Sequence, residues 1–141
     1  MPTARADIDN FLGHRRIAMV GVSRDPKHFS RYLLKEFRTR GYDVVAVNPT
    51  ADEIEGNHCF ATVKAIQPPV EAALLMTPPP ETEKVVHDCA EAGIQEVWMH
   101  RGGGQGSVSS AAVAFCRKQG MQFPHRVHGF IKKLVGSFPR A

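Results

Sequence analysis

Residues 16–49 constrain the fold of this chain more than any other stretch. Two apolar, β-branched runs, at 17–22 and 44–47, flank a segment whose apolar residues recur at helical spacing. These spaced residues are Phe29, Leu33 and Phe37. Gly41 follows them, where a helix would end before the second run begins. The order predicts a strand, a tight turn, a helix and a second strand, with the turn at the helix N-terminus.

The turn is where this unit would bind an anion, because unpaired N–H groups and the helix dipole favour negative charge there. Gly21 and Ser23 are small enough to let a ligand approach. The dinucleotide fingerprint G-x-G-x-x-G is absent, since Ser23 and Pro26 stand at its second and third glycine positions. The second run ends in Asn48, where an NAD-binding domain carries an acidic residue for the ribose. Both departures count against NAD.

Positive charge surrounds the turn. Four residues supply it: Arg24, Lys27, His28 and Arg31. This cluster suits a nucleotide that carries more phosphate than NAD. Lys27 stands just before the helix, where its ammonium can reach a phosphate. The alternative is a solvated helix face, because eight of the eighteen Lys and Arg residues fall between positions 15 and 40.

The rest of the chain continues the alternation of apolar runs and helical spacing. We expect further strands at 71–76, 95–99 and 121–123. We expect further helices at 6–13, 77–92, 107–120 and 127–135. Residues 50–70 are expected to form a loop, with a turn at Gly56-Asn57 and a single helical turn near 62–66.

This alternation predicts a single α/β domain over residues 1–141, with a Rossmann-like, open, mostly parallel sheet of about five strands and helices on both faces. Three glycines stand at expected helix C-caps: Gly41, Gly93 and Gly120. Ligands on such sheets bind beyond the carboxyl ends of the strands. Those ends are Gly21-Val22-Ser23, Asn48-Pro49, Thr77-Pro78 and His100-Arg101-Gly102.

The composition is that of a globular protein, with 43% hydrophobic and 23% charged residues. No run approaches the ~20 apolar residues of a membrane span, and the N-terminal segment lacks the apolar core of a signal peptide. Three cysteines without C-x-x-C spacing argue against a secreted disulfide scaffold. We therefore expect a cytoplasmic protein that does not bind membranes.

The net charge of +4 raises the question of nucleic-acid binding. No helix-turn-helix, zinc-finger or RNP pattern accompanies that charge. A polyanionic nucleotide accounts for the cations near the turn. We expect no nucleic-acid partner.

The sequence contains no recognisable catalytic or metal-binding set. Cys89 and Cys116 lie on predicted core faces, where cysteine acts as a small apolar residue. His125 and His128 have helical spacing, but no nearby carboxylate or thiol completes a metal site. His100 ends a strand at the ligand edge without a base, a nucleophile or an orienting carboxylate. We expect no catalytic residue and no metal.

Five segments resemble the small CoA-binding domain proteins, which are relatives of the N-terminal nucleotide domain of the succinyl-CoA synthetase α-subunit. The segments are G-V-S-R-D-P-K-H-F-S (21–30), G-Y-D-V-V-A-V-N-P (41–49), Gly56, T-P-P-P-E (77–81) and V-W-M-H-R-G (97–102). The resemblance implies a non-catalytic protein that binds coenzyme A or an acyl-CoA, with the nucleotide at the C-terminal edge of a parallel sheet. Carried onto this chain, the binding residues are Gly21, Val22, Ser23, Arg24, Lys27, Asn48, Pro49, Thr77, Pro78, His100 and Gly102.

One segment departs from that family pattern. Family members often carry a Cys-Pro-containing segment after the last strand, whereas here Gln122-Phe123-Pro124 leads straight to His125. This segment is therefore shortened relative to the family pattern, and the resemblance says least about the wall around the pantetheine arm.

Two alternative functions remain open. The first is an NAD(P)-dependent oxidoreductase that uses the same edge, with His100 as proton donor. The second is a CoA-responsive regulatory or protein-interaction module, which needs a protein partner or a homo-oligomer.

Overall fold

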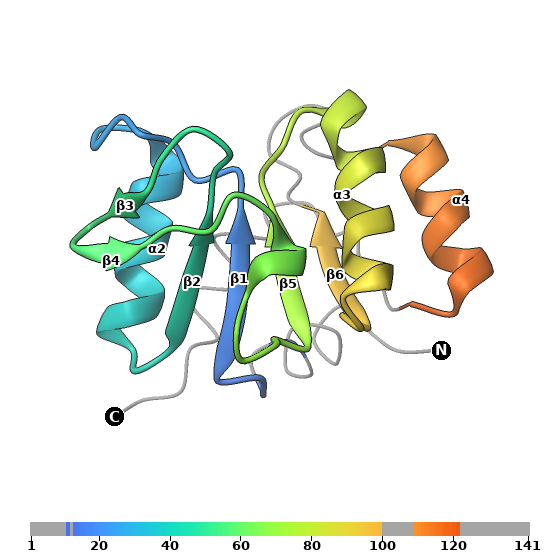
Figure 1. Cartoon of the computed structure of the whole chain (residues 1–141), viewed down its shortest axis with the longest axis horizontal. Helices are drawn as coiled ribbons and strands as arrows, with labels where there is room; N and C mark the ends of the chain where they lie inside the picture. Colours follow the sequence, from blue (N-terminus) through green and yellow to red (C-terminus); the bar gives the residue numbers. More distant parts are fainter. Residues whose placement is uncertain (1–10, 12, 100–108, 122–141) are drawn as a thin grey trace.

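The structure is a computed structural model that describes residue 11, residues 13–99 and residues 109–121. Four parallel strands form the central sheet in the order β2-β1-β5-β6 (Figure 1). Their bounds are β1 Arg16–Val20, β2 Asp43–Val47, β5 Ala72–Leu75 and β6 Glu96–Met99. The α/β fold with a Rossmann-like parallel sheet is confirmed.

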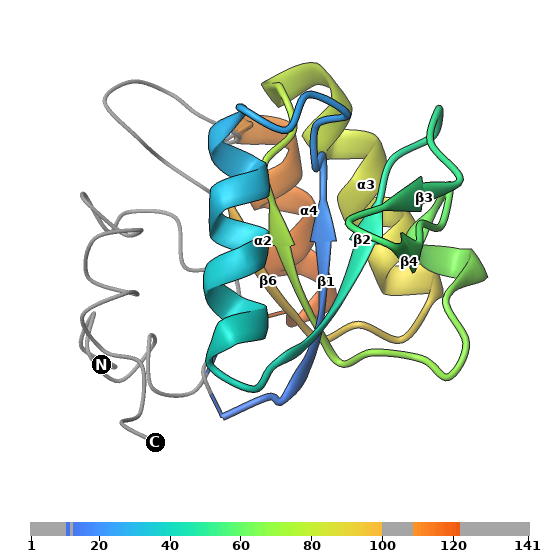
Figure 2. The same cartoon turned by 90° about the vertical axis from the view of Figure 1, so that its left-hand side faces the viewer.

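The sheet alternates its side chains between two apolar cores because successive strand residues point to opposite faces. On one face Ile17, Met19 and Leu74 pack against Leu33 and Phe37 of helix α2, Phe29–Thr39. The opposite face, built from alternate residues of the same strands, packs against helices α3 (Pro79–Glu91) and α4 (Ser110–Gln119). Figure 2 shows α2 and α3 on opposite sides of the sheet, so the expectation of helices on both faces is confirmed.

The helix boundaries follow from local signals in the sequence. Pro79 and Pro80 occupy the first turn of α3, where a missing N–H costs nothing. The Ser109 side chain caps α4 by accepting a hydrogen bond from the Ala112 N–H. Gly120 ends α4 in the left-handed conformation, with φ of 71°. Gly41 and Gly93 directly follow the C-caps of α2 and α3, so all three predicted helix-ending glycines are in place.

The prediction of a loop over residues 50–70, with a turn at Gly56-Asn57 and a helical turn near 62–66, misses one hairpin. The segment contains an antiparallel hairpin of two-residue strands, β3 (Glu53–Ile54) and β4 (Asn57–His58). The predicted helical turn is present as the 3-10 helix η1, Val63–Ala65. Strands of two residues are too short to show an alternating pattern, which explains why the sequence indicated only the turn between them.

The first strand also ends earlier than predicted. β1 stops at Val20, because Gly21 adopts a positive φ of 91° that turns the chain out of the sheet. The expected helices at 6–13 and 127–135 and the expected strand at 121–123 lie wholly or mostly outside the described residues. Within the part of the chain that the structure describes, no helix is long and apolar enough to cross a membrane.

Candidate functional site

The C-terminal ends of β1 and β5 mark the switch point of the sheet. From β1 the chain crosses to β2 on one side, and it then returns past β1 to β5 and β6 on the other. Such a reversal opens a crevice beyond the strand ends. Gly21 lies in this crevice, and its N–H donates to the Val47 carbonyl oxygen at 3.1 Å. The turn thus begins hydrogen-bonded to β2 and beside β5.

Gly21 is required at this point by both conformation and space. Its φ of 91° lies in the left-handed region that disfavours side chains. A Cβ added there would come within 3.0 Å of the carbonyl carbon and oxygen of Met76, and within 3.2 Å of the Thr77 nitrogen. The close approach of two backbone segments therefore fixes the shape of the switch point.

A cavity of about 340 Å³ lies beside this point, in the size range of small-molecule sites. Three groups of residues line it. The strand ends supply Val20, Gly21, Val47, Pro49 and Thr77; the segment at η1 supplies Ala61, Thr62 and Val63; α3 supplies Pro80, Glu81, Lys84, Val85 and Asp88. Apolar side chains predominate, so the cavity suits an apolar ligand group.

The charged residues of the cavity all come from α3. Asp88 is already paired, because the Lys64 ammonium lies 3.5 Å from its Oδ1 atom and 3.2 Å from Glu91. Lys84 is exposed and makes no ion pair with any described residue. Its ammonium is therefore available to an anionic ligand at the mouth of the cavity.

The turn from Gly21 to His28 is held mainly by hydrogen bonds within itself and to α2. The Ser23 N–H donates to Ser30 Oγ at 2.9 Å, and the Asp25 N–H donates to Ser23 Oγ at 3.0 Å. The Lys27 N–H donates to Asp25 Oδ1 at 3.0 Å. Among the residues that the structure describes, the Arg24 N–H has no hydrogen-bond partner. This N–H can therefore donate to a phosphate.

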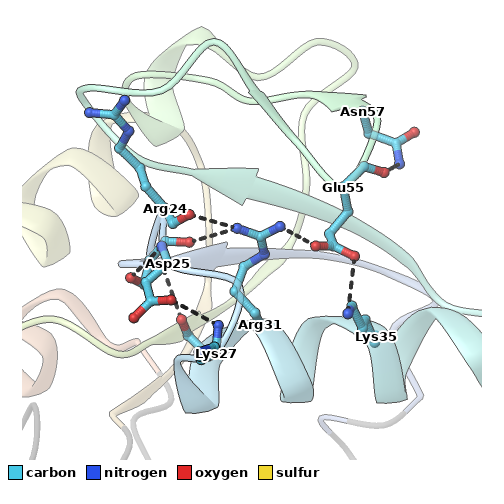
Figure 3. Close-up of polar contacts among 9 residues, drawn as sticks. Arg24, Asp25, Lys27, Arg31, Lys35, Glu55 and Asn57 are labelled. Atoms are coloured by element: carbon cyan, nitrogen blue, oxygen red, sulfur yellow. Dashed lines mark hydrogen bonds and ion pairs between the residues drawn. The ribbon is translucent and has the colours of Figure 1, made fainter.

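The four cations around the turn divide into two kinds. Arg24 and Lys27 are exposed and form no ion pair with described residues. Arg31 is 7% exposed, and its guanidinium donates to the carbonyl oxygens of Ser23 and Arg24 and to the Glu55 carboxylate (Figure 3). Both Nη atoms of Arg31 are therefore engaged by the turn backbone and by Glu55, while its buried Nε atom has no hydrogen-bond partner among the described residues.

His28 also serves the fold of the turn. It is the N-cap of α2, and its Nδ1 atom accepts a hydrogen bond from the Ser30 N–H at 3.1 Å. Capping the first turn in this way satisfies one of the free N–H groups that a helix start leaves. The cations left for a ligand are therefore Arg24, Lys27 and Lys84.

Asn48 ties the turn to the end of β2. Its side-chain amide donates to the Val22 carbonyl oxygen at 2.8 Å, and its Oδ1 accepts hydrogen bonds from the N–H and hydroxyl of Thr50. Pro49 lines the cavity. The Val22 side chain is fully buried in the core, so this residue can offer a ligand only its backbone.

Thr77 and Pro78 carry the chain from β5 into α3. Thr77 is 6% exposed, and its hydroxyl hydrogen-bonds that of Thr82 at 2.7 Å. Pro78 is the N-cap of α3 and makes no side-chain capping hydrogen bond. The short polar contact fixes the start of α3 over the cavity.

The structure thus brings together many of the residues predicted from the sequence. Gly21, Pro49 and Thr77 line one cavity. Val22, Ser23, Arg24 and Lys27 form the adjoining turn, which Asn48 joins to β2, and Pro78 starts α3. His100 and Gly102 lie outside the described residues. The predictions for these two residues remain expectations.

Sequence reasoning missed the contributions of Val63, Lys84 and Val85 to the cavity. The sequence analysis expects a loop with a helical turn near 62–66 and gives neither that segment nor the second turn of α3 a place at the ligand edge. A signal was available in T-P-P-P-E, because a helix that starts at a strand end must place its first turns beside the ligand edge.

The cysteines of the chain are structural. All three are buried and free, and Cys89 and Cys116 pack in the core under α3 and α4 as predicted. Burial raises the pKa of the Cys116 thiol to about 11, so it stays protonated and unreactive near neutral pH. Within residues 11, 13–99 and 109–121, no group of three or more His, Cys, Asp or Glu residues is placed to hold a metal ion.

Comparison with known families gives one match that covers most of the chain. Residues 15–126 match the model of a family described as CoA binding domain. This range includes the switch point, the turn and the whole of α3.

Two curated proteins are similar in sequence. The α-subunit of the ADP-forming acetate–CoA ligase II from Pyrococcus furiosus is 30% identical over 91 residues, which are 64% of this chain and 20% of the ligase subunit. The chain therefore spans only about a fifth of that relative's length. The uncharacterized protein YneT from Bacillus subtilis is 27% identical over 118 residues, 83% of this chain and 84% of YneT.

One similar solved structure has nearly the same extent as this chain. It is a conserved hypothetical protein from Pyrococcus furiosus, with a TM-score of 0.73 and 29% sequence identity. The match covers 84% of this chain and 98% of that protein.

Proposed function

The chain belongs to the CoA-binding domain family, and from this premise we propose that it is a non-catalytic protein that binds coenzyme A or an acyl-CoA. The binding site of the proposal is the C-terminal edge of the sheet. The observation that carries it is the junction at Gly21, where an apolar cavity and a cationic turn meet.

The chemistry of the two parts fits the two ends of a nucleotide. We assign the adenosine to the cavity, where Val20, Val47 and Val63 offer apolar contacts. We assign the phosphates to the turn, where the Arg24 N–H and the Lys27 ammonium are available. Charge-assisted hydrogen bonds of this kind are about twice as strong as neutral ones.

Two observations support a binding role without a reaction. Among the described residues of this edge, the thiols are buried, and the Ser30 hydroxyl, which contacts His28 Nδ1 at 2.8 Å, is fully buried and accepts the Ser23 N–H, so neither presents a nucleophile to a ligand. The matched region covers only 20% of the ADP-forming ligase subunit, so the activity of that whole subunit is not carried over to this chain. The three free cysteines also fit the cytoplasmic location that we propose.

A thermal-shift experiment tests the proposal. CoA at ~100 times its dissociation constant should stabilise the fold by about 2.7 kcal/mol, which corresponds to several degrees in Tm. NAD and NADP serve as control nucleotides, and we expect each of them to raise the Tm less than CoA does. No shift with millimolar CoA, together with a clear shift with NAD or NADP, contradicts the proposal and supports an oxidoreductase.

Native mass spectrometry of freshly purified protein extends this test to the thiol end of the ligand. A retained mass equal to CoA or to one acyl-CoA would identify the ligand class and the acyl group together. Bound nicotinamide nucleotide in the same spectrum would count against CoA.

A further inference from the structure

The turn rests on a buried arginine. Arg31 lies in the first turn of α2, with only 8% of its side chain exposed. Its Nη1 atom donates to the carbonyl oxygens of Ser23, at 3.3 Å, and Arg24, at 3.1 Å. Its Nη2 atom donates to Glu55. One guanidinium therefore joins two carbonyls of the turn to a residue 24 positions further along the chain.

Glu55 occupies a position that favours glycine or asparagine. It forms the corner of the β3–β4 hairpin with a positive φ of 53°, the only such value among non-glycine residues in the described part of the chain. This conformation costs a side-chain-bearing residue about 1–2 kcal/mol. The Glu55 carboxylate offsets part of this cost by forming ion pairs with Arg31 and with Lys35, whose ammonium lies 3.5 Å away. The hydrogen bond from Arg31 lowers the pKa of Glu55, which keeps the pair charged near neutral pH.

The hairpin that carries Glu55 is itself fixed to the sheet. Ile54 is buried in the core on the α2 face. Beyond the hairpin, the Phe60 N–H donates to the Ala46 carbonyl oxygen at 3.0 Å, and the Asn48 N–H donates to the Phe60 carbonyl oxygen at 2.9 Å. Glu55 therefore lies on a segment that is fixed to β2. Its ion pair with Arg31 connects the turn to that segment.

We propose that Arg31 and Glu55 act together as a positioning pair that sets the orientation of the Ser23 and Arg24 peptide groups for binding the phosphates of CoA. This inference rests on the proposed function. Because Arg31 holds both carbonyl oxygens, they cannot rotate toward a bound phosphate, and the Arg24 N–H remains available to it. Without the pair, a rotated peptide would present a negative carbonyl oxygen to the phosphate and weaken binding.

The direction in which one substitution changes the affinity for CoA distinguishes a positioning role from a purely electrostatic one. Glu55→Gln removes a negative charge near the turn, so charge alone would tighten the binding of an anionic nucleotide. Loss of positioning predicts the opposite, and we expect CoA to bind about tenfold more weakly. Glu36→Gln is the matched control. Glu36 lies on α2, the helix that carries Arg31, has 27% of its side chain exposed against 22% for Glu55, and pairs with Arg40 at 3.6 Å.

A double-mutant cycle tests whether the two residues act as one unit. Arg31→Lys keeps the charge but lacks the fork that reaches two carbonyls and a carboxylate at once. We expect Arg31→Lys and the double mutant each to weaken CoA binding about as much as Glu55→Gln alone. Isothermal titration gives the affinities, and a urea melt of each variant without ligand shows that it is folded.

Each outcome of these titrations decides a question. If the wild type binds no CoA, the proposed function fails and the positioning pair fails with it. If the wild type binds CoA but Glu55→Gln binds it as tightly as Glu36→Gln, only the positioning pair is overturned. Additive losses in the double mutant likewise overturn the pair while leaving CoA binding in place.

Discussion

The two edges of the central sheet carry cavities of similar size and opposite chemistry. The cavity at the C-terminal edge measures about 340 Å³, is lined mainly by apolar groups and adjoins the cationic turn. The cavity at the N-terminal edge measures about 300 Å³ and is lined by His14, Glu71, Gln95 and Glu96, with two glycines. Volume alone therefore does not identify the ligand site.

Carboxylates dominate the N-terminal edge. His14 lies between two of them, with its Nε2 atom 2.8 Å from Glu96 and its Nδ1 atom 3.7 Å from Glu71. Glu96 is 6% exposed, whereas 82% of the Glu71 side chain is exposed. A phosphate placed here would meet two negative side chains and one histidine.

The direction of the strands explains this difference. In a parallel sheet, the helix that follows a strand begins at the C-terminal edge and ends at the N-terminal edge. Thus α3 begins beside Thr77, while Gly93, just after its end, lines the N-terminal cavity. Helix N-termini carry partial positive charge and helix C-termini partial negative charge. The helix dipoles and the side chains therefore both favour an anionic ligand at the C-terminal edge, which is the site of the proposed function.

The largest effect on stability is expected from replacing a glycine by alanine at the C-terminal edge, and the same change at the N-terminal edge is its control. Gly21→Ala places a Cβ within 3.0 Å of the Met76 backbone at a φ of 91° and should destabilise the fold by roughly 2–5 kcal/mol. Gly93→Ala has a similar φ of 81° but meets no atom within 4 Å, so we expect about 1–2 kcal/mol. Urea melts measure both free energies of unfolding.

The difference in unfolding free energy between these two variants measures the cost of crowding the Met76 backbone at the switch point. Gly21→Ala should also weaken CoA binding at least about tenfold, because Met76 or the turn must move. Gly93→Ala should leave CoA binding unchanged. Equal losses of stability in the two variants would show that Gly21 is needed only for its backbone conformation.

Much of the fold could be predicted because its signals are local. The spacing of Phe29, Leu33 and Phe37 and the prolines at 78–80 are each read within one helix. The β3–β4 hairpin was missed because the residues at its corner and just after it, Glu55 and Phe60, are held by α2 and β2, which lie far away in the sequence. A two-residue strand has no periodicity of its own.

The same contrast between local signals and contacts with distant segments applies to the candidate site. Gly21, Pro49 and Thr77 could be predicted because parallel strands end at one edge, whatever their side chains touch. The role of Arg31 could not be predicted, because a position in the first turn of α2 suits a cation that contacts a phosphate as well as one that contacts carbonyl oxygens. Only the placement of Glu55, on a hairpin that the sequence did not reveal, decides between them.

An intermediate effect is expected for the exposed cation on the turn. Lys27→Ala should weaken CoA binding by about ten- to a hundredfold, since a charge-assisted contact contributes roughly 1.5–3 kcal/mol. The Tm without ligand should hardly change, because Lys27 makes no ion pair with described residues. The difference from the wild type should shrink as salt rises.

The matched control for Lys27 lies on the last turn of α4. Lys118 is exposed and has no ion pair with described residues. Lys118→Ala removes the same charge and should leave CoA binding within about twofold of the wild type. If Lys27→Ala binds CoA as tightly as the wild type at low salt, the phosphate role passes to Arg24.

The smallest effect is expected from a carboxylate at the opposite edge. Glu71 and Thr77 are six residues apart along β5 and its flanks, or about 20 Å at the rise of a strand. This exceeds the Debye length of about 8 Å at physiological salt, so a charge at Glu71 is screened from the turn. Glu71→Gln should therefore change the dissociation constant for CoA by less than about twofold in a calorimetric titration. A tightening comparable in size to the loss in Lys27→Ala would mean that the field of the whole protein, rather than contacts at the turn, selects the edge at which CoA binds.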